Sequence, residues 1–157
     1  MAFSNIQQIM AQLARQLSQR LAGTPAAAWS IRGEVAAQLP PAEDIAADVP
    51  RVILQAGAGS HAISGSLHRC FRYGCEAVLV APPEGEGSRA EALLPALAVL
   101  SSSLADLLAE WQGSPLVDAS DNVAAAFCVA AHTAAGETQT QNELFLFRQQ
   151  FTLVIQF

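Results

Sequence analysis

Histidine and cysteine, the side chains that most often bind zinc, gather in one short part of the sequence. The residues of this cluster are His61, His68, Cys70 and Cys75. A second pair, Cys128 and His132, has the spacing C-x3-H. The sequence contains no C-x2-C pair, which zinc sites usually include. We therefore expect the thiols to be small buried hydrophobic residues and the histidines to lie on the surface. A metal-binding or enzymatic site built from His61, His68 and Cys70 is the alternative.

A serine beside a histidine in a glycine-rich segment raises the question of nucleophilic chemistry at Ser60 and His61. The segment reads GAGSH, which is not the G-x-S-x-G elbow of serine hydrolases, and it lacks the lysine of a phosphate-binding loop. Residues 56–66 are small and polar, so we expect a mobile loop or a long hairpin tip here. We assign no catalytic residue, metal ligand or cofactor, and we expect that the protein is not an enzyme.

Two acidic residues, Glu84 and Glu86, alternate with glycine after a pair of prolines. Two carboxyl groups could in principle act as general acid and general base. Because they lie in a predicted turn, we expect both to be solvated. In a ring-forming protein, the same two carboxylates would instead line the mouth of the pore, and the sequence leaves both interpretations open.

Arginine and aromatic residues alternate in the segment that follows the cluster. Arg69 and Arg72 flank Phe71, and Tyr73 comes next. Arginine, tyrosine and phenylalanine are enriched in protein interfaces. These four residues are therefore interface candidates, although charges of this kind also keep an ordinary edge strand soluble.

Two segments have the apolar spacing of amphipathic helices. The first begins with a capping box at Ser4 and ends before Gly23. The second begins with a capping box at Ser88, carries leucines at three- and four-residue intervals, and ends at Gly113. Pro95 lies inside the second pattern, so we expect it to kink this helix or delay its start.

β-branched and alternating apolar residues predict strands elsewhere in the chain. The predicted strands cover residues 29–35, 51–55, 67–81, 122–132 and 144–157. We expect a bulge at Gly74 within the third strand. Residues 36–50, 82–87 and 136–140 are expected to be connecting loops and turns. The last two strands are expected to pair as an antiparallel hairpin.

The order of helix, strands, helix and strands predicts an α+β fold, with a mainly antiparallel sheet and two amphipathic helices packed on one face. With 157 residues, no internal repeat and no linker, we expect a single domain over residues 1–157. The chain stops on the apolar strand FTLVIQF, so Phe157 must be held by pairing in its own sheet or against a neighbouring chain.

Composition narrows the classes of function. The chain is 52% hydrophobic and only 14% charged, which excludes disorder and favours an obligate oligomer. Acidic residues number 14 and basic residues 8, all arginine, giving a net charge of −6. A broad nucleic-acid interface is therefore not expected, although an anionic lining would let DNA pass without sticking. No uninterrupted apolar run is long enough for a membrane span. Three cysteines and no signal-like N-terminus indicate a reducing interior.

The order of elements over nearly the whole chain resembles the tail terminator proteins of long-tailed bacteriophages. The features that carry the resemblance are an N-terminal amphipathic helix, a strand pair with a glycine-rich loop, a central helix and a closing strand, FRQQFTLVIQF. The resemblance implies a virion protein at the tail–neck junction, assembled in the host cytoplasm. It implies a hexameric homo-oligomeric ring that caps the tail tube, stops tube polymerisation and joins the tube to the head–tail connector protein.

In such a ring, DNA is only passing cargo and no membrane is involved. The interface candidates are Arg69, Phe71, Arg72, Tyr73, Arg148 and Phe157. The candidates for the lumen and its loops are Ser60, His61, Glu84, Glu86 and Glu137. The alternatives are another neck or head–tail joining subunit, the small cytosolic metal-binding or enzymatic domain named above, and a domain that binds a ligand between its sheet and helices.

Overall fold

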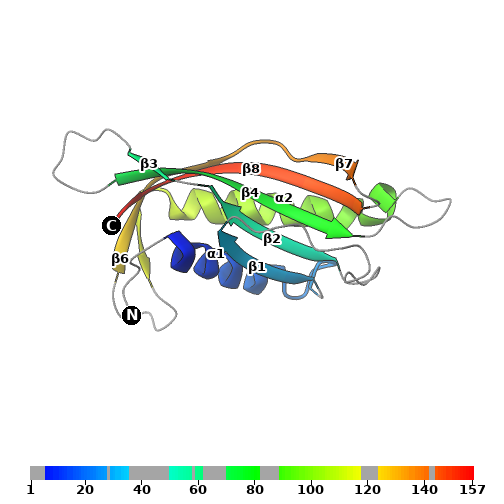
Figure 1. Cartoon of the computed structure of the whole chain (residues 1–157). Coiled ribbons are helices and arrows are strands. Elements are labelled where there is room, and N and C mark those ends of the chain that lie inside the picture. The colour runs from blue at the N-terminus through cyan, green and yellow to red at the C-terminus, as the bar shows by residue number, and fades with distance from the viewer. Residues whose placement is uncertain are drawn as a thin grey trace.

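A curved sheet and two helices form the computed structural model of the chain (Figure 1). The structure describes residues 6–27, 29–35, 50–57, 59–61, 70–81, 89–117, 124–141 and 144–157. The helices are α1 (Ile6–Leu21) and α2 (Arg89–Trp111). The strands are β1 (Ser30–Val35), β2 (Arg51–Ala56), β3 (Ser60–His61), β4 (Cys70–Ala81), β5 (Ser114–Val117), β6 (Ala124–Thr133), β7 (Glu137–Gln141) and β8 (Leu144–Gln156).

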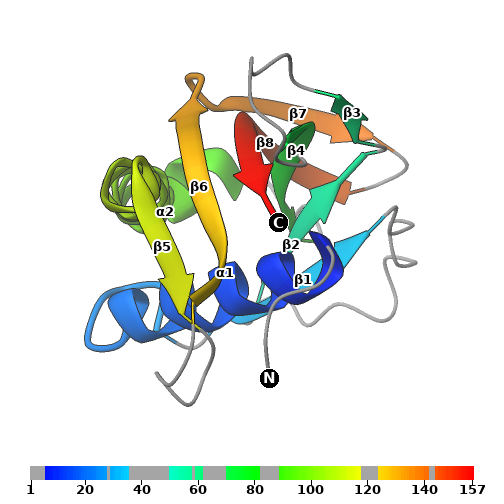
Figure 2. The ribbon, with the colours of Figure 1, turned by 90° about the vertical axis from the view of Figure 1, so that its left-hand side faces the viewer.

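The sheet has the strand order β1-β2-β4-β8-β6-β5. β1 pairs with β2 in parallel, and the remaining described pairs are antiparallel. β3 extends the β2 side of β4, and β7 extends the β6 side of β8. The long strands β4 and β8 curl, so the sheet is a half-barrel (Figures 1 and 2). The predicted α+β class with a mainly antiparallel sheet is confirmed.

The predicted bulge at Gly74 is wrong. The register between β4 and β8 runs without a shift from Tyr73↔Leu153 through Gly74↔Thr152 to Cys75↔Phe151. Nothing lies within 4 Å of the position that a Cβ at Gly74 would take. The glycine therefore leaves a hollow above a regular ladder.

The predicted polar loop at 136–140 is also wrong, because Glu137–Gln141 forms β7. This strand pairs with the first part of β8, from Glu137↔Arg148 to Gln141↔Leu144. β6 does pair with β8 in antiparallel fashion, as expected, but β7 comes between them in sequence. Gly136 allows this arrangement, since a Cβ there would overlap the ring of Phe147. Alternating threonines suit an extended conformation, but only the neighbouring strand makes β7 a strand.

The flexible segment predicted at 56–66 contains the two-residue strand β3, which pairs with β4 through Ser60↔Arg72 and His61↔Phe71. The hairpin-tip interpretation therefore fits the described part of this segment better than a free loop. The loops expected at 36–49 and 82–87 lie outside the described residues.

Both helices end where glycine was expected to end them. Gly23 and Gly113 have positive φ angles of 78° and 74°, a conformation that L residues with a Cβ rarely adopt. α2 begins at Arg89, so Pro95 does not delay its start. The capping serines, Ser4 and Ser88, lie outside the described residues.

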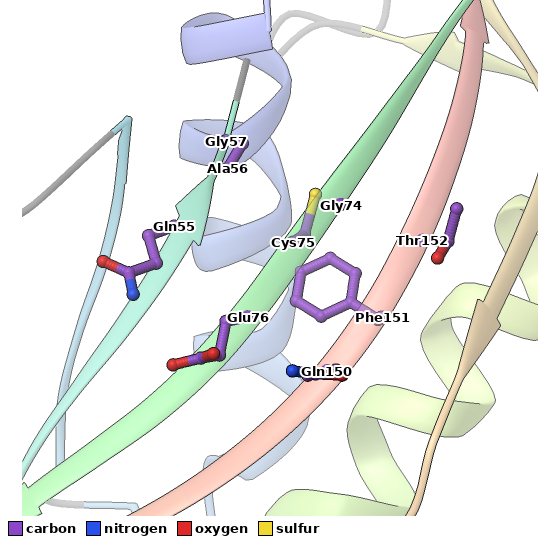
Figure 3. A pocket seen from close by; sticks show the side chains of 9 residues that line it. All are labelled: Gln55, Ala56, Gly57, Gly74, Cys75, Glu76, Gln150, Phe151 and Thr152. Carbon is purple, nitrogen blue, oxygen red and sulfur yellow. The ribbon is translucent and has the colours of Figure 1, made fainter. Parts of the chain in front are cut away.

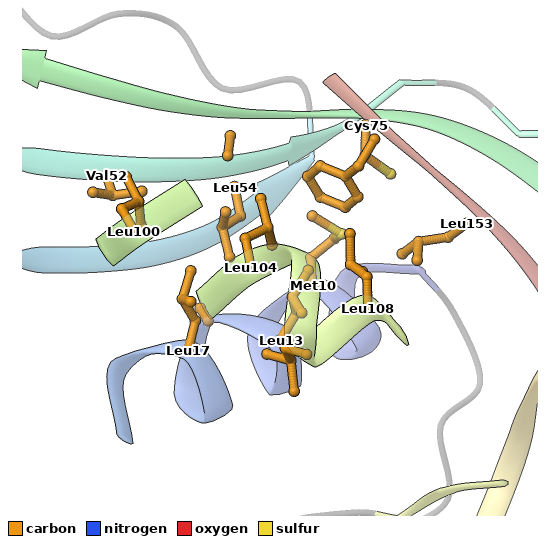
Figure 4. Close-up of a cluster of buried hydrophobic side chains, with 14 of the residues drawn as sticks. Met10, Leu13, Leu17, Val52, Leu54, Cys75, Leu100, Leu104, Leu108 and Leu153 are labelled. Carbon is orange, nitrogen blue, oxygen red and sulfur yellow. The ribbon is translucent and has the colours of Figure 1, made fainter. Parts of the chain in front are cut away.

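The main core cluster contains residues of both helices together with Phe147, Phe151 and Leu153, which lie on one face of β8, here called the inner face. α1 packs on β1 and β2, whereas α2 packs on β5, β6 and β8, and the two helices contact each other. Figure 4 shows the centre of this cluster, where Leu13 and Leu17 of α1 meet Leu104 and Leu108 of α2. Burying each such side chain stabilises the fold by about 1.5–3 kcal/mol.

Polar contacts tie the two helices together near the end of α2. The indole Nε1 of Trp111 donates to Oε1 of Gln16 at 2.8 Å, and Arg20 forms an ion pair with Glu110. A smaller cluster lies on the outer face of the sheet and comprises Ile53, Val78, Val80, Leu144 and Leu146. Each residue in it is at most 4% exposed, so both faces of the sheet carry buried side chains at this end.

One helical stretch, Leu93–Trp111, is long and apolar enough to cross a membrane by length and composition alone. Five of its leucines, Leu97, Leu100, Leu104, Leu107 and Leu108, are buried in the main core, whereas Leu94 is exposed.

Candidate functional site

The outer face of the sheet carries most of the polar groups that the sequence brings to the central strands. Arg148 of β8 forms an ion pair with Glu76 of β4, with side chains 28% and 20% exposed respectively. In the strand register, Glu76 of β4 lies between Gln55 of β2 on one side and Gln150 of β8 on the other. A row of amide and carboxylate groups therefore crosses β2, β4 and β8.

A hollow of about 670 Å³ lies beside this row (Figure 3). Its lining residues are Gln55, Ala56, Gly57, Gly74, Cys75, Glu76, Gln150, Phe151 and Thr152. The missing side chain of Gly74 opens the space, and the backbone N–H of Gly57 donates to the carbonyl oxygen of Gly74 at 3.0 Å. The only carboxylate of the lining, Glu76, is paired with Arg148. The hollow offers hydrogen bonds without a net charge.

The thiol at this hollow is not a nucleophile near neutral pH. Burial raises the pKa of Cys75 to about 12, and its Sγ donates to the carbonyl oxygen of Tyr73 at 3.6 Å. Burial also raises the pKa of Cys128 to about 11. Because the thiolate is the reactive form of cysteine, neither side chain is set up for covalent catalysis. All three cysteines are free and buried, as the sequence predicts.

The structure separates several of the possible metal ligands. Cys128 pairs with Ile155 on the inner face, whereas His132 pairs with Thr152 on the outer face. The C-x3-H spacing would place both on one face of a regular strand, but the register shift between Cys128 and Ala130 reverses this. Within the described residues, no group of three histidine, cysteine or acidic side chains could hold a metal ion. His68 lies outside the described residues.

Three of the six interface candidates form an aromatic group where β4 begins and β8 ends. The ring of Phe71 lies 6.2 Å from Phe157 and 6.4 Å from Tyr73, centroid to centroid. Tyr73 is 8% exposed and belongs to the core of its own chain, so it supports the strand from inside. Arg72 is exposed on the outer face, Arg148 is held by Glu76, and Arg69 lies outside the described residues.

The two lumen candidates whose side chains the structure describes, Ser60 and Glu137, do not come together. Ser60 is exposed in β3, and the backbone of His61 lies in the same strand. Glu137 is exposed in β7, on the other side of the β4–β8 pair, and Figure 1 shows β3 and β7 at opposite ends of the sheet. Glu84 and Glu86 lie outside the described residues.

Exposed apolar side chains are a feature that the sequence pattern does not predict. Among the described residues, three large hydrophobic side chains are exposed: Leu94 at 55%, Val129 at 42% and Phe127 at 38%. The alternation of Phe127, Cys128 and Val129 would have placed Phe127 and Val129 on one face of a strand. It could not have shown which face of the strand points to solvent.

The comparisons with known proteins give no family for this chain. No family model matches it, and no curated protein matches it. One solved structure, whose name carries no functional term, is similar over 99% of this chain and 98% of its own length. The identity is 15% and the TM-score 0.48, which is too low to support an argument about fold or function.

Proposed function

We propose that this protein is a structural subunit of a homo-oligomeric ring, the tail terminator of a long-tailed bacteriophage. In this role it caps the finished tail tube, ends tube polymerisation and binds the head–tail connector protein. It acts at the tail–neck junction of the virion after assembly in the host cytoplasm, with DNA as passing cargo. The proposal assigns no catalytic residue and no cofactor.

The observation that carries the proposal is the exposure of Leu94, Phe127 and Val129 on a chain with only 14% charged residues. Exposed apolar groups mark contact surfaces where they gather, as Phe127 and Val129 do on β6. The buried, high-pKa thiols and the paired carboxylate Glu76 fit a structural role better than a catalytic one.

The apolar strand before Phe157 is not evidence for an oligomer. β8 is paired on both sides within its own sheet, by β4 on one side and by β6 and β7 on the other. The pairing expected for the strand before Phe157 is therefore met within the subunit. The case for an oligomer rests on the surface instead.

We infer that the two helices pack on one face of the sheet, the inner one, as the sequence predicts. Their leucines and the inner-face residues Phe147, Phe151 and Leu153 belong to one cluster. This arrangement leaves the part of the outer face that carries Arg72 and Phe127, both exposed, available to other chains.

The first experiment is native mass spectrometry of the full-length protein, followed by negative-stain imaging and co-sedimentation with purified tail tubes. We expect a ring of about six subunits that binds at one end of the tubes. A ring that binds the connector but not the tube would favour another neck or head–tail joining subunit. A protein that stays monomeric and ignores the tubes would contradict the proposal.

A further inference from the structure

The exposed apolar residues lie on two separate surfaces of the subunit. The first, the outer patch, comprises Phe127, Val129 and Ala130 of β6, Pro115 of β5 and Val154 of β8. The second, the α2 stripe, comprises the apolar residues Leu94, Ala98 and Ala109 and, between them, Ser102 and Asp106. All five residues of the stripe are exposed and spaced at three or four positions, so they share one side of the helix.

The outer patch is held together by the strand register. Phe127 lies opposite Pro115 on β5 and opposite Gln156 on β8, and Ala130 lies opposite Val154. Phe127, Val129 and Pro115 are exposed, whereas Ala130 and Val154 are half-buried. These apolar groups are therefore neighbours on one face.

A β-bulge shapes the outer patch. The register shifts between Cys128 and Ala130, so Val129 is the extra residue and has no partner on β8. Bulges re-aim side chains and are often found next to functional surfaces. Here the bulge leaves Phe127 and Val129 exposed while Cys128 between them is fully buried.

The outer patch lies beside the C-terminal end of α2, whereas the α2 stripe runs along the helix from Leu94 to Ala109. The C-terminal end of α2 is fixed to β6, because the backbone N–H of Gly113 donates to the carbonyl oxygen of Cys128 at 2.7 Å. Figure 2 shows β5 and β6 beside this end of the helix. Leu94 lies near the other end, about 25 Å along the helix axis from Trp111 at 1.5 Å per residue. Leu94, the most exposed large hydrophobic residue described, therefore lies apart from the outer patch.

The charges of the two surfaces are complementary. Arg72, exposed and opposite Val154, borders the outer patch. Asp106 lies within the α2 stripe and is exposed, whereas the nearby Glu110 is already paired with Arg20. Apolar groups together with an arginine on one surface and a carboxylate on the other are typical of a specific protein contact.

We propose that the outer patch of one subunit binds the α2 stripe of a second copy of the same chain. A contact between two different surfaces of the same chain is head-to-tail, and it closes into a ring when the rotation between neighbours allows it. This inference rests on the proposed function, since it names the contact by which such a ring would form.

The test uses the variants Phe127→Asp and Leu94→Asp of the full-length protein, studied by analytical ultracentrifugation. Each variant lacks one of the two surfaces, so we expect each alone to lose the ring, with association weakened about 30-fold or more. The matched control is Gln139→Asp, which adds the same charge at an exposed position of β7 and should leave the ring intact. Near-UV circular dichroism checks that every variant is folded.

Mixing the two variants tests the pairing itself. Phe127→Asp retains a normal α2 stripe, and Leu94→Asp retains a normal outer patch, so the mixture should form dimers with one intact contact and nothing larger. The single substitution Arg72→Glu should weaken assembly of the ring. Added salt should weaken assembly of the wild-type ring.

Several outcomes would overturn the inference. A ring formed by either single variant, or a mixture that remains monomeric, would show that these surfaces do not bind each other. Flotation of the wild type with phosphatidylglycerol vesicles, lost in Leu94→Asp, would show that the stripe faces lipid. A wild-type chain that stays monomeric at millimolar concentration would overturn the inference and the ring together. A tube-capping ring that tolerates both substitutions would overturn the inference alone.

Discussion

Gly33 of β1 lies directly against the backbone of Met10 in α1. A Cβ at Gly33 would overlap the carbonyl oxygen of Met10. Gly33 faces the core side of the sheet, opposite Leu54, so this contact sets how closely α1 approaches β1. The absence of a side chain at this one position allows the helix to cover the edge of the sheet.

The variant Gly33→Ala should therefore lower the free energy of unfolding by about 1–3 kcal/mol, because the added methyl group forces α1 away from β1. Chemical denaturation measures the change. The matched control is Gly74→Ala, where nothing lies within 4 Å of the new Cβ. That variant should be neutral or stabilising by up to about 1 kcal/mol. Equal effects of the two substitutions would contradict the close packing at Gly33.

The ion pair between Glu76 and Arg148 should contribute more than the one between Arg20 and Glu110. The first pair is mostly buried, whereas the side chains of the second are 34% and 61% exposed. We expect Glu76→Gln to cost about 1.5–3 kcal/mol, because Arg148 loses a charged acceptor. Glu110→Gln should cost less than about 1 kcal/mol. Urea denaturation at low and high salt measures both, and a similar cost for the two would count against this ranking.

The stability of the protein should fall at high pH because of its buried thiols. The pKa of Cys75 is about 12 in the folded protein, above the usual value near 8.5 of an unfolded chain. The thiol therefore contributes its full stability below about pH 8.5, and this contribution is lost as the pH rises towards the folded value. Between those limits the unfolded state binds fewer protons, so each such thiol lowers the free energy of unfolding by up to about 1.4 kcal/mol per pH unit.

Denaturation of the wild type and of Cys75→Ala between pH 7 and pH 10.5 tests this expectation. The Cys75→Ala variant lacks the ionising thiol, and the packing defect that it introduces does not change with pH. Its free energy of unfolding should therefore fall less steeply with pH than that of the wild type. Tyr73, whose pKa is raised by burial and by Cys75, adds a loss of the same sign in both proteins above about pH 10. Parallel curves for the two proteins would show that Cys75 is not protected from ionisation.

Gln149 interrupts the aromatic stripe of β8, and replacing it should stabilise the protein. The residue is 2% exposed, and its Nε2 donates to Oγ1 of Thr133 at 2.9 Å. Its Oε1 is buried without a hydrogen-bond partner, which costs about 1–3 kcal/mol. Thr133 keeps a second bond of 3.1 Å to the carbonyl oxygen of Gln150.

The variant Gln149→Met, of similar length, should therefore raise the free energy of unfolding by about 1 kcal/mol, measured by thermal and chemical denaturation. Gln150→Met is the control, because Gln150 is exposed on the outer face and its replacement should change stability little. A loss of stability in Gln149→Met would mean that Oε1 has a partner in solution, such as a bound water molecule.

Parts of this structure could be predicted from local pattern alone. The leucine spacing that ends at Gly113 and the alternation that begins at Leu144 reveal a helix and a strand, because each element buries one side and the periodicity records it. The positive φ at Gly23 and Gly113 follows from the same logic, since glycine adopts this conformation without a steric cost.

Other parts depended on partners far away in the sequence. β7 is a strand because the first part of β8 offers it a free edge, whereas its own residues are all polar or small. The ladder continues through Gly74 because β8 stays in register on the far side. The bulge falls instead at Val129, which separates Cys128 from His132 and breaks up a spacing that suggests a metal site.

The sequence by itself determined the fold class, the positions of both helices and the burial of the thiols, because hydrophobic periodicity and composition are local properties. Only the tertiary structure decided which apolar residues stay exposed. Phe127 and Leu153 are both large hydrophobic residues, yet the side chain of Leu153 is buried in the main core and that of Phe127 is exposed to solvent. That difference depends on the strand register and on Val129, the extra residue of the bulge. Both are set by pairing between strands that lie far apart in the sequence, and the local sequence does not set them.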